Sequence, residues 1–155
     1  MNEGIIIFLL SMLPLTELRA SIPLAISVYG MSSVSAFLWS VTGNIIVAGL
    51  IIWLIGPIFN FASKHLIFLK NILTWIFERT RSKTTNKYLK WGQWALVLFV
   101  AIPLPGTGVY TGALTAYLFG LSKIKSFILI SLGAFIAGVL VVLITKGVIS
   151  ALVIF

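Results

Sequence analysis

The sequence contains no cysteine, one histidine and three acidic residues among its 155 positions. The absence of cysteine excludes disulfides, thiolate metal sites and thiol catalysis. We find no Ser/His/Asp set, phosphate-binding glycine loop or cluster of metal ligands, so we expect no enzyme, no cofactor and no metal. Charged residues make up only 9% of the chain, against about 25% in soluble domains.

Apolar residues, by contrast, are abundant. Hydrophobic residues account for 60% of the sequence, and the mean hydropathy is +1.15. This balance is typical of an all-α integral membrane protein, and the length predicts a single membrane domain over residues 1–155. The N-terminal apolar run has no basic residue before it and no small-residue cleavage pattern, so we interpret it as mature sequence.

The net charge of +8 arises because eleven Lys and Arg residues stand against three acids. Most of these basic residues fall in a single segment that connects two apolar parts of the chain. A cytoplasmic loop explains that concentration better than nucleic-acid binding does. We therefore expect a multi-pass protein of the cytoplasmic (cell) membrane and no nucleic-acid partner.

Four apolar blocks follow one another, at residues 4–30, 33–56, 91–120 and 126–145. The first is broken by Pro14, a polar cluster at residues 16–19 and Pro23, and the third by residues 103–108 (PLPGTG). The second and fourth are uncharged and reach the ~20 residues of a membrane-spanning helix. Pro57 is predicted to end the second block. Residues 58–80 predict an amphipathic interfacial helix, and residues 79–90 a basic linker.

The two halves resemble each other. A shift of 90 residues superposes seven identical residues of the first half on the second, namely Leu24, Gly30, Ser32, Phe37, Gly43, Ile46 and Leu50. The pattern predicts repeat 1 (4–56), a connecting region (57–90) and repeat 2 (91–146). Interrupted apolar segments at corresponding places in two repeats are typical of transporters, where they mark the binding site.

Two topologies compete. If all four blocks cross the membrane, seven loop charges lie on one side and Lys123 and Lys125 on the other. If the broken blocks are re-entrant hairpins, each half crosses once, the halves are inverted, and these nine charges share one side. The positive-inside rule favours the second topology. We therefore predict an inverted repeat of a re-entrant helical hairpin plus a transmembrane helix.

The first break carries Glu17, Arg19, Ser21 and Pro23. At a turn between two half-helices, Glu17 and Arg19 can both point into one cavity. The planar guanidinium suits phosphate or carboxylate, and a carboxyl in a poorly solvated site suits proton carriage. The alternative is a structural ion pair that neutralises both side chains.

The second break supplies a different set of groups. Glycines free backbone N–H groups, and a helix beginning near Gly108 presents its positive end to an anion. The alternative is that Gly108 and Gly112 serve only close helix packing. The predicted binding residues of this break are Pro103, Pro105, Gly106, Thr107, Gly108, Tyr110 and Thr111.

Two motifs carry a resemblance to a known family. Residues 17–25 (ELRASIPLA) and 103–114 (PLPGTGVYTGAL) resemble the paired signatures of the small multidrug export family, a compact relative of the DedA/VTT membrane protein superfamily. The resemblance spans essentially the whole chain and implies facing re-entrant helices in a transporter or lipid flippase. Its wider superfamily moves polyprenyl phosphates and phospholipids. The larger DedA proteins carry a further acid in the first motif and an arginine in the second, which this chain lacks.

These observations favour a flippase-like transporter of a phosphate-bearing lipid, either passive or linked to protons. Arg19 would bind the head group and Glu17 would carry the proton. One alternative is a proton-coupled multidrug exporter of hydrophobic cations, with Glu17 as counter-ion. Another is a membrane scaffold that binds lipids without transporting them. The expected partners are membrane lipids, the substrate, protons and a second copy in a homodimer.

Overall fold

The computed structural model describes residues 2–65, 86–104 and 106–154, and over these residues the chain is all helical, without strands. Two helices are long and apolar enough to cross a membrane, over Ser33–Phe59 and Lys123–Ala151. The predicted all-α class is therefore confirmed. The helices are α1 (Glu3–Ser11), α2 (Glu17–Ser27), α3 (Ser33–His65), α5 (Asn86–Ala101), α6 (Val109–Leu118) and α7 (Lys123–Ile154).

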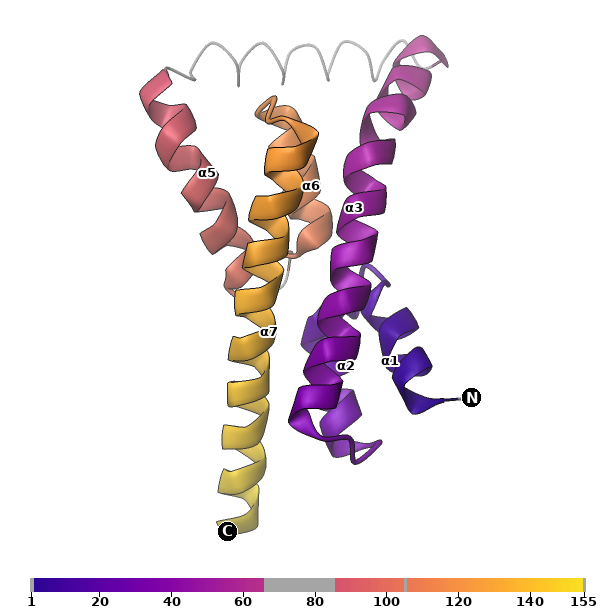
Figure 1. The fold of residues 1–155 in the computed structure, drawn as a ribbon, viewed down its shortest axis with the longest axis vertical. Helices are drawn as coiled ribbons and strands as arrows, with labels where there is room; N and C mark the ends of the chain where they lie inside the picture. The colour runs from indigo at the N-terminus through magenta and orange to yellow at the C-terminus, as the bar shows by residue number, and fades with distance from the viewer. Residues whose placement is uncertain (1, 66–85, 105, 155) are drawn as a thin grey trace.

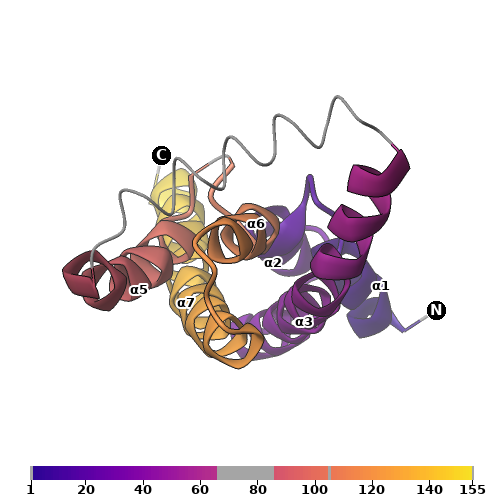
Figure 2. The ribbon, with the colours of Figure 1, turned by 90° about the horizontal axis from the view of Figure 1, so that it is seen from above.

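The two long helices α3 and α7 run in opposite directions and pack against each other (Figure 1). Helices α1 and α2 form a hairpin that rises from one end of the molecule, and α5 and α6 form one that descends from the other end. The turns of the two hairpins meet near the middle of the long axis. Helices α2 and α6 each contact both α3 and α7, and seen from above α6 lies over α2 (Figure 2).

Corresponding glycines shape the two hinges that lead into the long helices. Gly30, after α2, has φ +62°, and Gly120, after α6, has φ +68°. Glycine adopts this left-handed conformation without the steric cost that a Cβ imposes. The next residue in each hinge then donates its N–H back to the preceding helix, Met31 to the Ala25 carbonyl at 2.9 Å and Leu121 to the Ala116 carbonyl at 3.0 Å.

A second pair of corresponding glycines lets each hairpin approach its long helix closely. A Cβ on Gly43 of α3 would lie 2.6 Å from the Phe8 carbonyl oxygen of α1. A Cβ on Gly133 of α7 would lie 2.9 Å from the Val97 carbonyl oxygen of α5. Real Cβ atoms do not approach backbone this closely, so both positions require glycine. These glycines set the depth at which the hairpins sit, and hence where their turns meet.

Two prolines behave differently from the sequence-based prediction. Pro57 does not end the second block, because α3 continues through it to His65. Pro23 does not break the first block either, because it lies inside α2. A lone proline removes one intrahelical hydrogen bond, and within an apolar helix the neighbouring helices and small local adjustments compensate for that loss. In the first block, the chain turns between α1 and α2, around Pro14.

The connecting region is also partly corrected. Residues 58–65 extend α3 rather than starting a separate interfacial helix. Residues 86–90, predicted as linker, form the beginning of α5. The rest of the predicted interfacial helix and basic linker, residues 66–85, lies outside the described residues. The fourth block is longer than predicted, because α7 already begins at Lys123 and ends at Ile154.

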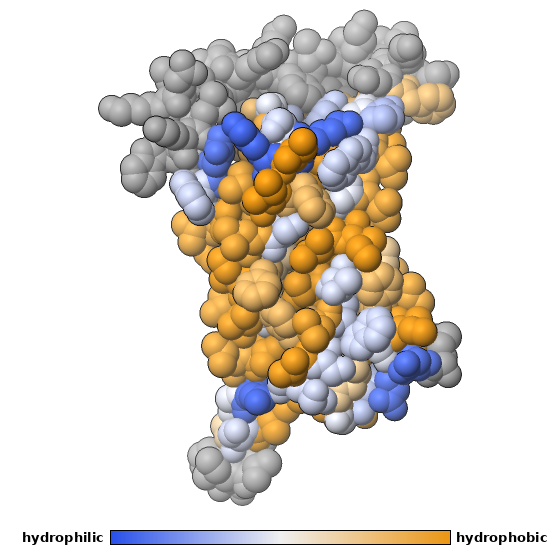
Figure 3. All heavy atoms as spheres, in the orientation of Figure 1, coloured by the Kyte–Doolittle hydropathy of each residue, from blue (hydrophilic) through white to orange (hydrophobic). Residues whose placement is uncertain are grey.

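The face of the molecule seen in Figure 3 is largely apolar between its two ends. Many large hydrophobic side chains of the described residues are exposed, among them Leu50, Trp53, Leu98, Phe135 and Leu143. The same face is more hydrophilic toward both ends, as Figure 3 shows. A soluble domain rarely exposes so wide an apolar surface, whereas a bilayer covers it. Together with the two long apolar helices, this surface identifies a membrane protein.

Candidate functional site

The turn between α1 and α2 places Glu17 at the meeting point of the two hairpins. The Thr16 hydroxyl donates a hydrogen bond to the Leu10 carbonyl and closes the turn. Glu17 then begins α2 with φ +41°, in the region that L residues rarely adopt. Such a conformation costs about 1–2 kcal/mol and persists only where surrounding contacts hold it.

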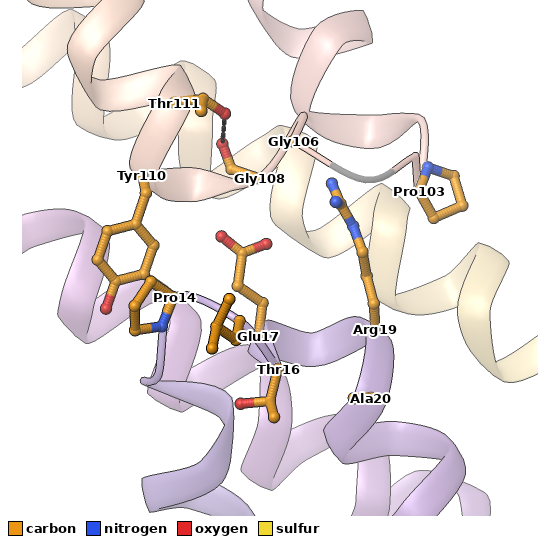
Figure 4. A pocket seen from close by; sticks show the side chains of 11 residues that line it. Pro14, Thr16, Glu17, Arg19, Ala20, Pro103, Gly106, Gly108, Tyr110 and Thr111 are labelled. Carbon is orange, nitrogen blue, oxygen red and sulfur yellow. Dashed lines mark hydrogen bonds between the residues drawn. The ribbon is translucent and has the colours of Figure 1, made fainter.

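Contacts with the second hairpin hold Glu17 in place. Its side chain is only 6% exposed, and its carboxylate accepts hydrogen bonds from the backbone N–H groups of Val109 and Tyr110. These are the first two residues of α6, whose N–H groups have no partner within the helix. The predicted anion-binding helix end therefore exists, and the carboxylate of Glu17 occupies it (Figure 4).

Gly108 makes this contact possible. A Cβ at Gly108 would collide with both carboxylate oxygens of Glu17. Its backbone, at φ −84° and ψ −167°, is open to any residue, so glycine is required here for space and not for conformation. Gly112 has another role, because a Cβ there would lie 2.7 Å from Val100 of α5. Of the two glycines, Gly112 serves helix packing and Gly108 accommodates the carboxylate.

Arg19 also reaches the second hairpin. Its guanidinium donates one hydrogen bond to the Leu104 carbonyl and another to the Thr107 hydroxyl, the latter at 2.9 Å. The Thr107 hydroxyl is fixed in turn by the Ile102 carbonyl, to which it donates at 2.7 Å. Figure 4 shows Arg19 pointing from α2 toward the turn between α5 and α6. Of the five N–H donors of an arginine, three stay unused by the described part of the chain.

A third contact joins the hairpins on the other side of Glu17. The Tyr110 hydroxyl donates a hydrogen bond to the Met12 carbonyl in the turn between α1 and α2. Among the described residues, Glu17 and Arg19 form no direct ion pair, since each binds the second hairpin instead. The two charges interact only at longer range.

The hairpin turns enclose a pocket of about 560 Å³. This volume is within the range of small-molecule sites. Arg19 and Glu17 supply its charged groups. Leu15, which also lines the pocket, is 97% exposed on the outer surface. The full lining is Pro14, Leu15, Thr16, Glu17, Arg19, Ala20, Pro103, Gly106, Gly108, Tyr110 and Thr111.

Most of the residues predicted for the site come together here. Glu17, Arg19, Pro103, Gly106, Gly108, Tyr110 and Thr111 line the pocket, and Thr107 bonds to Arg19 behind it. Ser21 does not line the pocket, because its hydroxyl donates to Ser40 of α3 at 2.8 Å. Pro23 lies further along α2 and is not part of the lining either. Pro105 lies outside the described residues.

Sequence reasoning missed four residues. Pro14, which was predicted only to break the first block, lines the pocket, as do Leu15 and Ala20, which carry no group that would single them out in a sequence. Asn44 is fully buried in α3 beside Glu17 and Arg19. Its signal was available, because it is the only amide in the uncharged block 33–56.

The fold and the site define a helical membrane protein with a polar site between two hairpins. Comparison with protein families matches residues 17–140, a stretch that begins at Glu17, the first residue of α2, and includes the turn between α5 and α6. The chain belongs to the family described as "Putative small multi-drug export protein". No curated protein and no solved structure matches it. The resemblance to the small multidrug export family is thus confirmed.

Proposed function

We propose that this protein is a transporter that moves an amphiphile with an anionic, phosphate-bearing head group across the cytoplasmic membrane. The observation that carries the proposal is the distribution of charge in the pocket. The carboxylate of Glu17 is turned onto the N-terminus of α6, while three donors of Arg19 have no partner among the described residues. The group left for a ligand is therefore a guanidinium, which binds phosphate oxygens in pairs.

The mouth of the pocket suits an amphiphile. Leu15 is 97% exposed, and Leu13 and Leu104 on the two hairpin turns are 50% and 56% exposed. A head group bound at Arg19 would have its apolar chain beside these side chains and the lipid around them. Polyprenyl phosphates and phospholipids have this chemistry, and they are the substrates expected from the wider DedA/VTT superfamily. That superfamily relationship itself stays a prediction.

The proposed architecture is an inverted repeat, in which both hairpins are re-entrant and α3 and α7 cross the membrane. The corresponding glycines at the hinges and at the hairpin contacts support it, since each pair does the same work in both halves. Backbone that is not helical is tolerated at membrane depth when protein buries it or when it lines a polar cavity. Both hairpin turns meet that condition at the pocket.

Cysteine labelling tests this architecture. The chain has no native cysteine, so Ser33→Cys, Lys83→Cys and Ser122→Cys each carry one label site. In the re-entrant architecture, a membrane-impermeant maleimide modifies Lys83→Cys and Ser122→Cys from the cytoplasmic side and Ser33→Cys from the opposite side. If Ser33→Cys and Ser122→Cys react from the same side and Lys83→Cys from the other, all four apolar blocks cross the membrane and the proposed architecture is wrong.

A second candidate is a proton-coupled exporter of hydrophobic cations, which the description of the family favours. In that function Glu17 would be the counter-ion of the drug. The carboxylate would first have to leave the N–H groups of Val109 and Tyr110, and Arg19 beside it would repel a cation. The contacts of the site thus favour an anionic head group, with Glu17 carrying a proton. Both candidates are non-enzymatic, and a homodimer suits either.

Transport by the purified protein in vesicles tests the function. We expect wild-type protein to move a fluorescent phosphate-bearing lipid between leaflets faster than protein-free vesicles do, measured by quenching with an impermeant reductant. Parallel vesicles loaded with tetraphenylphosphonium measure export of a hydrophobic cation. Movement of the cation alone would establish the second candidate. If neither probe moves with or without a proton gradient, the protein is a non-transporting lipid-binding scaffold.

A further inference from the structure

Asn44 has a buried polar atom that finds no partner in the described part of the chain. The residue is fully buried in α3. Its side-chain N–H group donates to the Ser11 carbonyl at 2.8 Å, and weakly to the Ser40 carbonyl at 3.5 Å. Its Oδ1 accepts no hydrogen bond from any residue that the structure describes. An unsatisfied buried acceptor costs about 1–3 kcal/mol. A donor that binds Oδ1 in only one state of the protein would explain why this acceptor is retained.

The surroundings of Asn44 indicate which group that is. Asn44 lines a narrow void together with Glu17, Arg19, Gly108 and Val109. The void offers no space for a water-sized sphere, so water cannot satisfy the amide oxygen there. The other lining residues are Leu18, Val100, Ala134 and Ala137, whose side chains have no donor. Among the side chains that line the void, only those of Glu17 and Arg19 can supply a donor for Oδ1.

Arg19 already directs its guanidinium to the second hairpin, where Leu104 and Thr107 accept from it. Glu17 has no donor while it is ionised, because a carboxylate only accepts hydrogen bonds. In that state the N–H groups of Val109 and Tyr110 satisfy it. Once it binds a proton, it gains one O–H donor that needs an acceptor. Asn44, whose Oδ1 accepts no hydrogen bond from the described residues, lines the same void.

We propose that Asn44 is the positioning residue that receives the O–H of protonated Glu17 through its side-chain oxygen. The inference rests on the proposed function, in which Glu17 carries a proton. It adds the residue that binds Glu17 while Glu17 is protonated. Ionised Glu17 binds the end of α6, and protonated Glu17 shares its proton with α3. Uptake and release of one proton would then change the contact between the two hairpins, and no covalent bond other than the O–H of Glu17 is made or broken.

No other group that lines the pocket or the void changes its protonation state in the acid and neutral range. Among the residues that line the pocket and the void, only Arg19 of α2 and Tyr110 of α6 are titratable besides Glu17 itself. Arg19 stays charged and Tyr110 stays neutral through the acid and neutral range. Helices α3, α5 and α7 face Glu17 with Asn44, Val100, Ala134 and Ala137, all of them neutral.

The wild-type protein in nanodiscs provides the first test. With ¹³C-labelled asparagine, we expect the side-chain carbonyl resonance of Asn44 to shift as the sample is taken from alkaline to acid pH. The shift should follow the protonation of Glu17 and be absent in Glu17→Gln, which has no proton to exchange. A resonance that does not move in the wild type, or that moves equally in Glu17→Gln, would overturn the proposal.

Infrared spectroscopy of variants provides the second test. The chain has only three acidic side chains, so Glu3→Gln/Glu78→Gln leaves Glu17 as the only one that titrates. In this background we expect Asn44→Leu to move the carbonyl stretch of protonated Glu17 to the higher frequency of a carboxylic acid without a strong hydrogen bond. Ser131→Ala is the matched control, because the Ser131 hydroxyl is the other buried side-chain atom without a partner among the described residues. It lines neither the pocket nor the void, so its removal should leave the stretch unchanged.

Neither measurement needs a substrate, so failure of this inference and failure of the proposed function can be told apart. If the Asn44 resonance follows Glu17 but the vesicles transport nothing, the proton contact exists and the transport function is wrong. If transport is coupled to protons but neither spectrum changes, the transporter stands and Asn44 has only a structural role.

Discussion

Replacing Arg19 by glutamine is expected to lower transport of a phosphate-bearing lipid at least about tenfold, because hydrogen bonds to charged groups contribute about 1.5–3 kcal/mol. Glutamine keeps a donor that can reach the Leu104 carbonyl or the Thr107 hydroxyl, so the contact between the hairpins is only weakened. What it removes is the positive charge and the paired donors. The measurement is the initial rate of lipid movement in vesicles, at several lipid concentrations.

Two further variants make this result specific. Arg19→Lys keeps the charge but not the planar fork, so it should retain part of the rate with weaker binding. Glu17→Gln removes the only acidic side chain of the pocket. Under the proposed function, Arg19→Gln abolishes binding of the head group, while Glu17→Gln leaves binding and removes the dependence on protons. The reverse order of severity, with cation export lost only in Glu17→Gln, would instead support a drug exporter.

The sequence located the interruptions of the helices where they carry several turn signals together. Residues 103–108 combine prolines and glycines, and α5 and α6 are indeed separate helices on either side of them. Pro23 and Pro57 stand alone in apolar runs, and both lie inside helices. A proline in a water-exposed helix is a reasonable signal for the end of that helix. In an apolar environment no water is present to bond to the backbone N–H and C=O groups, so the chain stays helical.

The sequence indicated most residues of the candidate site, but not which of them contact one another. Glu17 and Arg19 are expensive in an apolar block and attract notice for that reason. Their partners Thr107, Val109 and Tyr110 lie about ninety positions away, a separation across which a single sequence gives no contact information. The sequence therefore predicted a free anion site at the start of α6, whereas the protein fills it with its own carboxylate. It also left open a Glu17–Arg19 ion pair, but in the structure each of the two side chains binds the second hairpin instead.

Gly108→Ala is expected to have an effect out of proportion to its size, because the added methyl group occupies the place of the Glu17 carboxylate. The backbone of Gly108 tolerates alanine, so the only direct conflict is with Glu17. The carboxylate must leave, and the N–H groups of Val109 and Tyr110 lose their acceptor. Loss of that buried bonding costs about 2 kcal/mol, which corresponds to a fall in Tm of about 4–8 °C for a chain of this length.

A double-mutant cycle shows whether the effect passes through Glu17. In Glu17→Ala the carboxylate is gone, so adding Gly108→Ala should lower the Tm by little more than the single change to Glu17 does. Gly92→Ala is the matched control, since Gly92 is a helical glycine of α5 whose added Cβ would meet nothing; it should be neutral or slightly stabilising. If the two changes at Gly108 and Glu17 are additive, glycine is needed there for another reason. A strong coupling would show that the Glu17 carboxylate at the start of α6 is one of the contacts that hold the two hairpins together, and it is the contact that proton uptake would release.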